Sequence, residues 1–154
     1  MTDTLNKVRR SKNMAAVKSH NTKPELIIRS ALYSAGYRYR LHVKKLPGKP
    51  DIVLTRYQSV IFINGCFWHG HSCHLFRWPK TRQEYWKKKI GRNIYNDRKN
   101  TELLKSNWRI GIIWECALRG KSQIPLKNIL TQIDDWLISD LPATEIQGQE
   151  VTNK

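Results

Sequence analysis

The spacing of apolar residues in the first part of the chain predicts a helix. Between Thr22 and Gly36, apolar residues recur at helical spacing, and Pro24 occupies the first turn. Asn21 or Thr22 would cap this helix, because a short polar side chain accepts a hydrogen bond from a free backbone N–H, and Gly36 would end it. The expected buried side consists of Leu26, Ile27, Ala31, Leu32 and Ala35.

Three strands are expected after this helix. Residues 37–43, Y-R-Y-R-L-H-V, alternate with period two, and the turn sequence L-P-G-K-P follows them. Two apolar segments, D-I-V-L at 51–54 and V-I-F-I-N at 60–64, are separated by the polar residues R-Y-Q-S. The three strands can pair in sequence order as a meander.

The second half of the chain predicts two helices and one more strand. A long polar helix is expected over residues 81–106, with apolar contacts from Tyr85, Ile90, Ile94, Leu103 and Leu104. Residues 108–116, W-R-I-G-I-I-W-E-C, predict an apolar strand, and residues 125–138 have the 3.6-residue period of an amphipathic helix. The elements together predict a small mixed α/β fold in which helices flank a sheet.

The two ends of the chain differ from this central part. Residues 1–20 are interpreted as a basic N-terminal arm or helix, whose apolar stripe is weak. Residues 21–140 are expected to form one domain, which agrees with the 154-residue length. Residues 141–154 are polar, and we expect them to form a disordered tail.

Charge is distributed unevenly along the chain. The formal net charge is +16, and residues 1–130 contain 27 Lys and Arg against 7 Asp and Glu, whereas residues 131–154 contain 1 against 5. A body this basic favours nucleic acid as the partner, because basic side chains that neutralise phosphates release counterions. The alternative is a basic surface that is merely solvated. No apolar run approaches the ~20 residues of a membrane span, and no signal-peptide core is present, so the expected location is cytosolic.

The segment I-N-G-C-F-W-H-G-H-S-C, residues 63–73, combines two cysteines with two histidines and two large aromatic residues. Cys66 and Cys73 lie in it, and Cys116 ends a later strand that could return to the same edge of the sheet. With one histidine they would form a Cys₃His shell, which is typical of structural zinc. The alternative is three unrelated apolar cysteines. Spacing leaves three histidines open as the fourth ligand: His69, His71 and His74.

Carboxylates are scarce in the basic part of the chain, so their placement is informative. Asp51 begins a predicted strand, and Glu25 lies in the first turn of a predicted helix. Phosphodiester hydrolysis needs a hard cation, usually Mg²⁺, held by one or two carboxylates, and a base that accepts a proton from water. Asp51, Glu25 and His69 supply these groups. Their structural alternatives are a turn-capping Asp, a Glu favoured by the helix dipole, and a solvated loop His.

Several ordered motifs resemble the very short patch repair endonucleases, the Vsr family. They are L-P-G-K-P-D-I-V-L, V-I-F-I-N-G-C-F-W-H-G-H-S-C, R-x-x-Y-W-x-x-K-I-G-R-N-x-x-x-D and G-x-x-I-W-E-C-A-L-R-G. The similarity begins at R-S-K-N-M, residues 10–14, and continues to about residue 120. It therefore covers the predicted domain except for its last helix.

The resemblance implies a fold and a set of site residues. The fold would be restriction endonuclease-like, related to the PD-(D/E)xK nucleases, although the ExK signature is absent here as it is in Vsr-like enzymes. Asp51 and the backbone carbonyl of Ile63 would bind Mg²⁺, and His69 would be the base. Glu25 would orient water bound to that ion, and Asp97 would help to order the side of the site that holds the phosphate. The structural zinc would be bound by Cys66, His71, Cys73 and Cys116.

One departure from the family pattern affects the expected chemistry. Relatives often carry Thr-His where this chain has Ile63 and Asn64. Ile63 is compatible with a carbonyl ligand, because every residue supplies a carbonyl. Asn64 can donate a hydrogen bond to a phosphate or water but does not accept a proton at neutral pH. We therefore expect slower cleavage or a shifted pH optimum, with His69 still the base.

The resemblance also implies the substrate. The position of Phe67 and Trp68 in a loop beside candidate metal ligands favours their insertion between base pairs, together with Trp86 from the basic helix, and insertion is easier where a mismatch has weakened stacking. The alternative is that these rings are core residues. Trp108, Trp114 and Trp136 fit a core instead. The expected reaction is a nick 5′ of the T in a T:G mispair left by deamination of 5-methylcytosine. Phosphate contacts are expected from Arg82, Lys87, Lys88, Lys89, Arg92 and Arg98.

Two functions of different kinds remain open from the sequence. The first is a monomeric Mg²⁺-dependent nickase acting on mismatched double-stranded DNA, and retention of Asp51, Glu25, His69 and Asp97 favours it. The second is a zinc-stabilised module that binds mismatched DNA and has lost its cleavage activity. The change to Ile63 and Asn64 would then mark that loss. A restriction-type nuclease that cuts unmodified duplexes is a weaker third alternative. The sequence leaves open whether a mismatch-repair protein is a further partner.

Overall fold

The computed structural model describes residues 21–149. The predicted arm at residues 1–20 lies outside this range. The helices are α2 (Lys23–Ser34), α3 (Gln83–Leu104) and α4 (Leu126–Ile138), with short 3-10 turns at Thr55–Tyr57 and Glu115–Ala117. The strands are β1 (Arg40–Leu41), β2 (Ile52–Leu54), β3 (Ser59–Asn64), β4 (Arg109–Trp114) and β5 (Ala143–Ile146).

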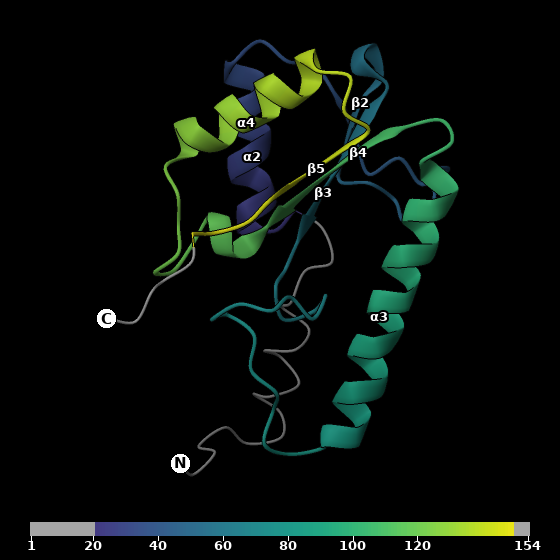
Figure 1. The fold of residues 1–154 in the computed structure, drawn as a ribbon, viewed down its shortest axis with the longest axis vertical. Coiled ribbons are helices and arrows are strands. Elements are labelled where there is room, and N and C mark those ends of the chain that lie inside the picture. Colours follow the sequence, from purple (N-terminus) through teal and green to yellow (C-terminus); the bar gives the residue numbers. More distant parts are fainter. Residues whose placement is uncertain (1–20, 150–154) are drawn as a thin grey trace.

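The five strands form one mixed sheet in the order β1-β2-β3-β4-β5. The pairs β1–β2 and β2–β3 are antiparallel, which confirms the predicted meander, whereas β3–β4 and β4–β5 are parallel. Parallel neighbours need a crossover, and α3 supplies it between β3 and β4. Helices α2 and α4 lie on one side of the sheet and α3 on the other (Figure 1). The mixed α/β prediction is confirmed.

Each face of the sheet packs against its own helices. Ile61 and Ile113 belong to the cluster that contains residues of α2 and α4, whereas Val60 and Ile110 pack with Leu104 of α3. Successive strand residues point to opposite faces, so strands covered on both faces become apolar throughout. This explains the continuous apolar runs in β3 and β4.

The buried side of α2 differs from the prediction. Leu32 is fully buried, as predicted, but its buried neighbours on the helix are Ile28 and Glu25, whereas Leu26 is 46% exposed and Ala35 is also exposed. The helix packs on the sheet through positions 25, 28 and 32, which share one face at spacings of three and four residues. The predicted face, centred on Leu26 and Ala31, instead lines a surface groove beside α4.

Helix α3 is shorter and more exposed than predicted. It begins at Gln83 and ends at Leu104, and only Ile90 and Leu104 are buried in it. Tyr85 and Leu103 are 43% and 55% exposed, so these two predicted apolar contacts are wrong. A crossover helix that touches the sheet along one line buries few residues.

The predicted disorder after residue 141 is wrong for the next few residues. Ala143–Ile146 form β5, which pairs with β4 through Ile110↔Ala143 and Ile113↔Ile146, and Ile146 is 1% exposed. An edge strand is held by backbone hydrogen bonds on one side, so only one of its four residues is buried and the composition stays polar.

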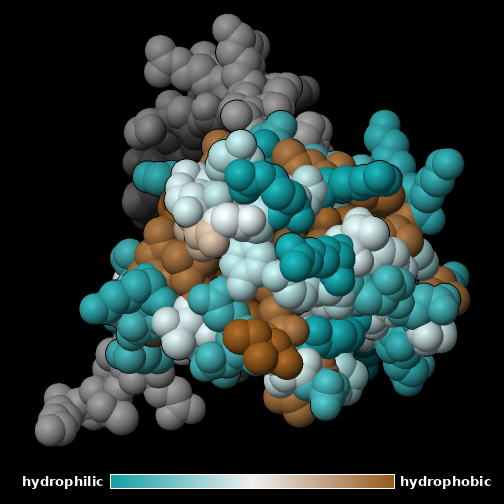
Figure 2. Space-filling view, turned by 90° about the horizontal axis from the view of Figure 1, so that it is seen from above, coloured by the Kyte–Doolittle hydropathy of each residue, from teal (hydrophilic) through white to brown (hydrophobic). Residues whose placement is uncertain are grey.

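The surface has no large continuous apolar face in the view of Figure 2, where hydrophilic side chains separate several hydrophobic groups. Single exposed apolar residues such as Ile138, 82% exposed, are ordinary in soluble proteins. Within residues 21–149, no helix has the length and apolar character needed to cross a membrane.

Candidate functional site

A cavity of about 540 Å³ lies beside the ends of β2 and β3. It brings together predicted site residues from four separate segments, which are Asp51, Ile63, Asn64, His69 and Asp97. Lys44 and Lys49 also line it, so cationic side chains stand close to the acidic ones. The fourth predicted acid or base, Glu25, is buried outside the cavity lining and offers a carboxylate oxygen within 4.8 Å of one from Asp51.

Asp51 is held at the start of β2 by the neighbouring strand. Its Oδ2 accepts a hydrogen bond from the backbone N–H of Ile63, at 2.7 Å. Burial raises the pKa of Asp51 to about 6; the Ile63 bond opposes this rise, the Glu25 charge adds to it, and His69 lowers it. A buried carboxylate beside another carboxylate is a good ligand for a cation, because the cation removes the repulsion that raises its pKa.

We predict that Asp51 makes the protein less stable as pH rises when no divalent cation is added. The ordinary pKa of 3.8 applies to the unfolded chain and about 6 to the folded protein. The folded state therefore holds the proton more tightly, and this contribution is present below pH ~4 and lost as pH rises through 6. Thermal denaturation should show Asp51→Asn to be more stable than the parent at pH 8, by on the order of 2 kcal/mol.

The difference between Asp51→Asn and the parent should shrink toward pH 4, where the parent carboxyl is protonated. Asp135→Asn, an exposed substitution on α4, serves as the control and should follow the parent at every pH. Equal melting temperatures of Asp51→Asn and the parent at pH 8 would contradict the assigned burial effect.

Glu25 is buried at the N-terminus of α2. Its Oε2 accepts from the backbone N–H of Asn21 at 2.6 Å, while Thr22 Oγ1 accepts from the N–H of Glu25 at 3.4 Å. This reciprocal pair is a capping box, and it shows Thr22 to be the N-cap. The structural explanation of Glu25 thus accounts for one carboxylate oxygen. The other oxygen, Oε1, lies 2.7 Å from His42 Nε2 and 3.8 Å from a guanidinium nitrogen of Arg29.

His42 is a site residue that the sequence reasoning missed. Its Nε2 lies 2.7 Å from Glu25 Oε1, and Glu25, His42 and Asp51 each offer an atom within 4.8 Å of the others, a spacing that fits a metal ion. His42 has a φ of +49°, in the left-handed region that few non-glycine residues adopt. In the sequence, His42 is one polar residue in an alternating strand. The feature that could have indicated its role is the turn L-P-G-K-P, which follows this strand and brings it back toward Asp51.

His69 and Asp97 form a pair across the cavity. His69 Nδ1 lies 2.5 Å from Asp97 Oδ2, and Asp97 belongs to α3. When Nδ1–H donates to a carboxylate, Nε2 keeps its lone pair and can accept a proton. Neighbouring Gly70 has a φ of +63°, and a Cβ there would lie 2.8 Å from Ile94 of α3, so this glycine lets the loop pack close to the helix.

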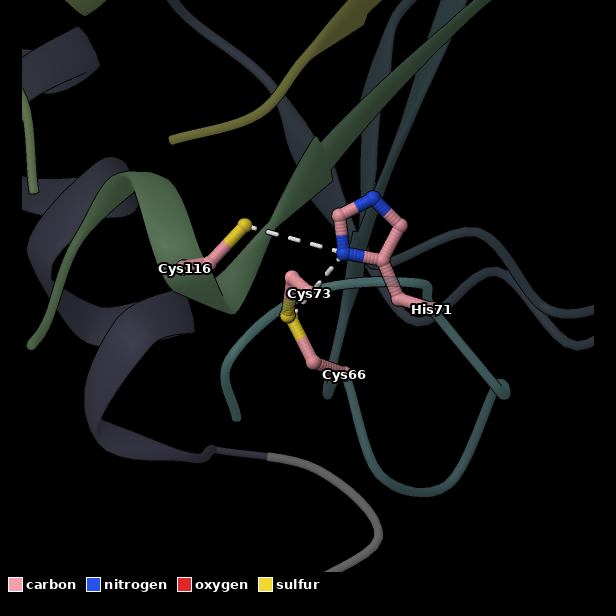
Figure 3. Close-up of side chains that lie close together, drawn as sticks. All are labelled: Cys66, His71, Cys73 and Cys116. Carbon is pink, nitrogen blue, oxygen red and sulfur yellow. Dashed lines mark hydrogen bonds between the residues drawn. The ribbon is translucent and has the colours of Figure 1, made fainter. Parts of the chain in front are cut away.

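A second group of candidate ligands combines three residues of the loop with Cys116. Cys66, His71, Cys73 and Cys116 offer one atom each within 4.8 Å of the others, and their side chains point toward one another in Figure 3. His71 Nδ1 lies 3.5 Å from Cys66 Sγ and 3.6 Å from Cys116 Sγ. Three sulfurs and one imidazole nitrogen suit tetrahedral zinc.

The structure distinguishes the three histidines that spacing left open. His69 pairs with Asp97, and His74 Nδ1 lies 3.3 Å from Ser122 Oγ. Only His71 joins the cysteine cluster among residues 21–149. Burial raises the pKa of the Cys66 thiol, and a bound cation would reverse this effect, because a coordinating thiol is deprotonated.

The aromatic residues of the loop form a cluster with α3. The ring centroids of Phe67 and Trp68 lie 5.3 Å apart, and that of Trp86 lies 5.4 Å and 5.9 Å from them. All three line an open cavity of about 800 Å³ and are only partly buried. The three tryptophans predicted for a core all pack in one. Trp136 lies in the cluster with α2 and α4, Trp108 packs against the cluster with α3, and Trp114, 8% exposed, is buried with Cys66 and Cys116, where its ring stacks on that of His71.

The basic residues predicted to contact phosphates follow α3. All six are exposed, which suits both an anionic partner and plain solvation: Arg82, Lys87, Lys88, Lys89, Arg92 and Arg98. The guanidinium of Arg82 also lies 4.3 Å from the centre of the Tyr85 ring.

The chain is similar to known DNA endonucleases. The model of the family described as DNA mismatch endonuclease Vsr matches residues 2–75. The DNA mismatch endonuclease Vsr of Escherichia coli is 39% identical over 152 residues, which are 98% of this chain and 97% of that protein. The type II nicking enzyme V.XorIIP of Xanthomonas oryzae pv. oryzae is 47% identical over 133 residues, 84% of this chain and 98% of that protein.

A second nicking enzyme extends the comparison. The type II nicking enzyme V.NmeAIP of Neisseria meningitidis serogroup A is 45% identical over 138 residues, 88% of this chain and 99% of that protein. These similarities span the cavity, the cysteine cluster and the aromatic loop rather than one motif. The protein therefore belongs to the Vsr family of DNA mismatch endonucleases and is a DNA endonuclease.

Proposed function

We propose that the protein is a Mg²⁺-dependent endonuclease that nicks one strand of duplex DNA 5′ of the T in a T:G mispair. The main support is that Asp51 and the His69–Asp97 pair line one cavity, with the buried Glu25 carboxylate within 4.8 Å of Asp51 and a cluster of partly exposed aromatic rings beside the loop. We assign the sheet to the restriction endonuclease-like fold on the resemblance of its motifs.

The cavity residues divide the reaction between them. Mg²⁺ would be held by Asp51 and the carbonyl of Ile63, and when bound it would supply charge stabilisation at the phosphate. His69 would accept the proton of the attacking water through Nε2, while Asp97 holds the ring by Nδ1. Glu25 Oε1 would orient water beside Asp51. Lys44 and Lys49 provide positive charge near the phosphate.

The cysteine cluster would bind zinc and shape the loop. Cys66 and Cys73 lie within the loop and Cys116 follows β4, so one ion would fix Phe67 and Trp68 relative to the sheet. A shell filled by four protein ligands leaves no position for water, so this zinc would be structural. The enzyme is proposed to act as a monomer, and co-purification would test a mismatch-repair protein as a further partner.

The proposed reaction is tested with two duplexes that differ only in T:G or T:A at one position. Purified protein with Mg²⁺ should nick the T:G duplex in one strand and leave the T:A duplex intact. Tight binding to T:G without nicking would favour the binding module instead. Cleavage of both duplexes would favour the restriction-type nuclease.

We predict that shortening the aromatic side chains lowers mismatch discrimination. Stacking of a base on an aromatic ring is worth about 1–3 kcal/mol, so Trp68→Ala should reduce the preference for T:G over T:A binding by roughly tenfold. Fluorescence anisotropy with both duplexes would measure this ratio. Tyr95→Ala is the control, because Tyr95 is 66% exposed on α3 and lies outside the aromatic cavity. An unchanged ratio in Trp68→Ala would remove this residue from mismatch recognition.

Asn64 is the specific observation that favours the binding-module alternative. It is 8% exposed at the end of β3 and lines the same cavity as Asp51 and His69. We predict that Asn64→His nicks T:G duplexes roughly tenfold faster than the parent, or shifts the pH optimum of nicking. A histidine can transfer protons, and a positioned acid or base contributes about 10²–10⁴-fold to a reaction rate.

The nicking rate of Asn64→His should be followed from pH 6 to 9 under single-turnover conditions. Asn96→His on the exposed surface of α3 is the control for added imidazole. If Asn64→His and the parent share one rate profile, Asn64 has no part in the mechanism.

A further inference from the structure

The C-terminal segment from Glu145 to Gly148 contacts two members of the cysteine cluster directly and a third residue, Trp114, that packs against it. Gln147 Oε1 lies 2.9 Å from His71 Nε2, and the backbone N–H of Gly148 donates to Cys116 Sγ at 3.2 Å. Glu145 Oε1 accepts from the Trp114 indole N–H at 2.6 Å. The Trp114 ring in turn stacks on the His71 ring, with centroids 4.0 Å apart and planes 9° apart.

The Gln147 contact determines which nitrogen of His71 can bind a metal. His71 Nδ1 faces the sulfurs of Cys66 and Cys116, so a metal in the cluster needs the lone pair of that nitrogen. A neutral imidazole carries one N–H. If Nε2–H donates to Gln147 Oε1, Nδ1 is unprotonated and points at the metal position. Outer hydrogen bonds of this kind orient a ligating histidine and raise its basicity.

The Gly148 contact acts on a second ligand. The backbone N–H of Gly148 points at Cys116 Sγ, and a hydrogen bond donated to a sulfur orients it and favours its thiolate form. Gly148 can approach this closely because it has no side chain. A Cβ at this position would lie 2.4 Å from Ser122 Oγ and 2.5 Å from the Cys116 carbonyl oxygen. The sequence therefore needs glycine here for the backbone N–H to reach the sulfur.

We infer that Glu145, Gln147 and Gly148 complete the metal centre as its outer hydrogen-bonding layer, so that metal binding and docking of β5 strengthen each other. This inference rests on the zinc assignment of the proposed function. The coupling must be reciprocal, because a segment that raises metal affinity when docked is itself held more tightly when the metal is bound. Gln147 is thus a positioning residue that acts through His71.

The first arm of the test measures zinc affinity of the full chain by competition with a chromophoric chelator. Gln147→Ala should weaken zinc binding about 10- to 100-fold, the usual effect of removing such a partner. Gln147→Glu keeps an oxygen that accepts from His71 Nε2–H and should restore affinity close to that of the parent. Gln149→Ala is the matched control, because Gln149 bonds to the Ser122 carbonyl through its backbone N–H.

The second arm measures hydrogen exchange in the parent with and without zinc. Removing the ion should speed exchange at the amides of Ile146 and Gly148 by at least tenfold, and the same change should be smaller in Gln147→Ala. A merely structural glutamine would alter stability without changing the dependence of these amides on zinc.

The outcomes separate this inference from the function on which it rests. If the parent holds one zinc and Gln147→Ala binds it as tightly as Gln149→Ala does, the inference is overturned while the nicking proposal stands. If Gln147→Glu fails to restore affinity, the hydrogen bond is not the cause and the inference is likewise overturned. A parent that nicks T:G duplexes but contains no zinc overturns the zinc assignment and this inference with it.

Discussion

Replacement of Asp51 by asparagine should abolish nicking of T:G duplexes while leaving DNA binding intact. Asp51 is proposed to hold the catalytic cation, and stabilisation of the phosphate by a cation is worth several kcal/mol. Each ~1.4 kcal/mol changes a rate tenfold, so the nicking rate should fall by roughly 10³-fold or more. Single-turnover cleavage with saturating Mg²⁺ and anisotropy with the same labelled duplex would measure both properties.

The variant Asp51→Asn is chosen because it separates chemistry from folding. Asparagine has nearly the same shape and keeps an oxygen that can accept the Ile63 N–H. It also removes a carboxylate whose pKa is raised by burial, so the variant should be more stable than the parent above pH 7. Loss of activity in a more stable protein would not be explained by unfolding.

Duplex binding by the variant and the activity of a control variant complete the Asp51 experiment. Binding of the T:G duplex should be equal or tighter in Asp51→Asn, because one negative charge near a phosphate is removed. Asp135→Asn, whose carboxyl is exposed on α4, should nick at the parent rate. Residual Mg²⁺-dependent nicking by Asp51→Asn within tenfold of the parent would place the metal elsewhere.

The parts of the fold with a strong apolar period were predictable from the sequence. The meander β1–β2–β3, the helices α2, α3 and α4, and strand β4 all appear where their periods place them. Strand β5 was not predictable, because its four residues bury only Ile146 and gain their order from backbone pairing with β4. Pairing of an edge strand depends on which neighbour is available, and local composition does not encode that.

The Cys₃His cluster was predictable up to the choice of its histidine. Residue type and spacing point to Cys66, Cys73 and Cys116, but spacing along the chain cannot distinguish His71 from its neighbours. The turn geometry decides, since it directs His71 Nδ1 to the sulfurs and His69 to Asp97. His42 was not predicted as a site residue either. Its position beside Glu25 depends on a positive φ angle, which is again a matter of turn geometry.

Disruption of the proposed zinc site should have the largest effect on stability. We predict that Cys73→Ser binds no stoichiometric zinc and melts at least about 10 °C below the parent. Structural zinc contributes free energy of folding directly, and a loss of several kcal/mol corresponds to a shift of this size, at ~2–4 °C per kcal/mol for a chain of about this length. Cys73 is suited to the test because it is only partly buried, so serine should pack there with little strain.

The Cys73→Ser variant should also lose its preference for T:G duplexes, because Phe67 and Trp68 lie between the cluster's first two ligands in the chain. Zinc content by elemental analysis, the melting temperature, and binding to T:G and T:A duplexes should therefore change together. Ser72→Ala, an exposed substitution next to Cys73, should change none of them. If Cys73→Ser melts with the parent, the three cysteines are independent apolar residues, and the aromatic loop takes its shape from packing against α3 alone.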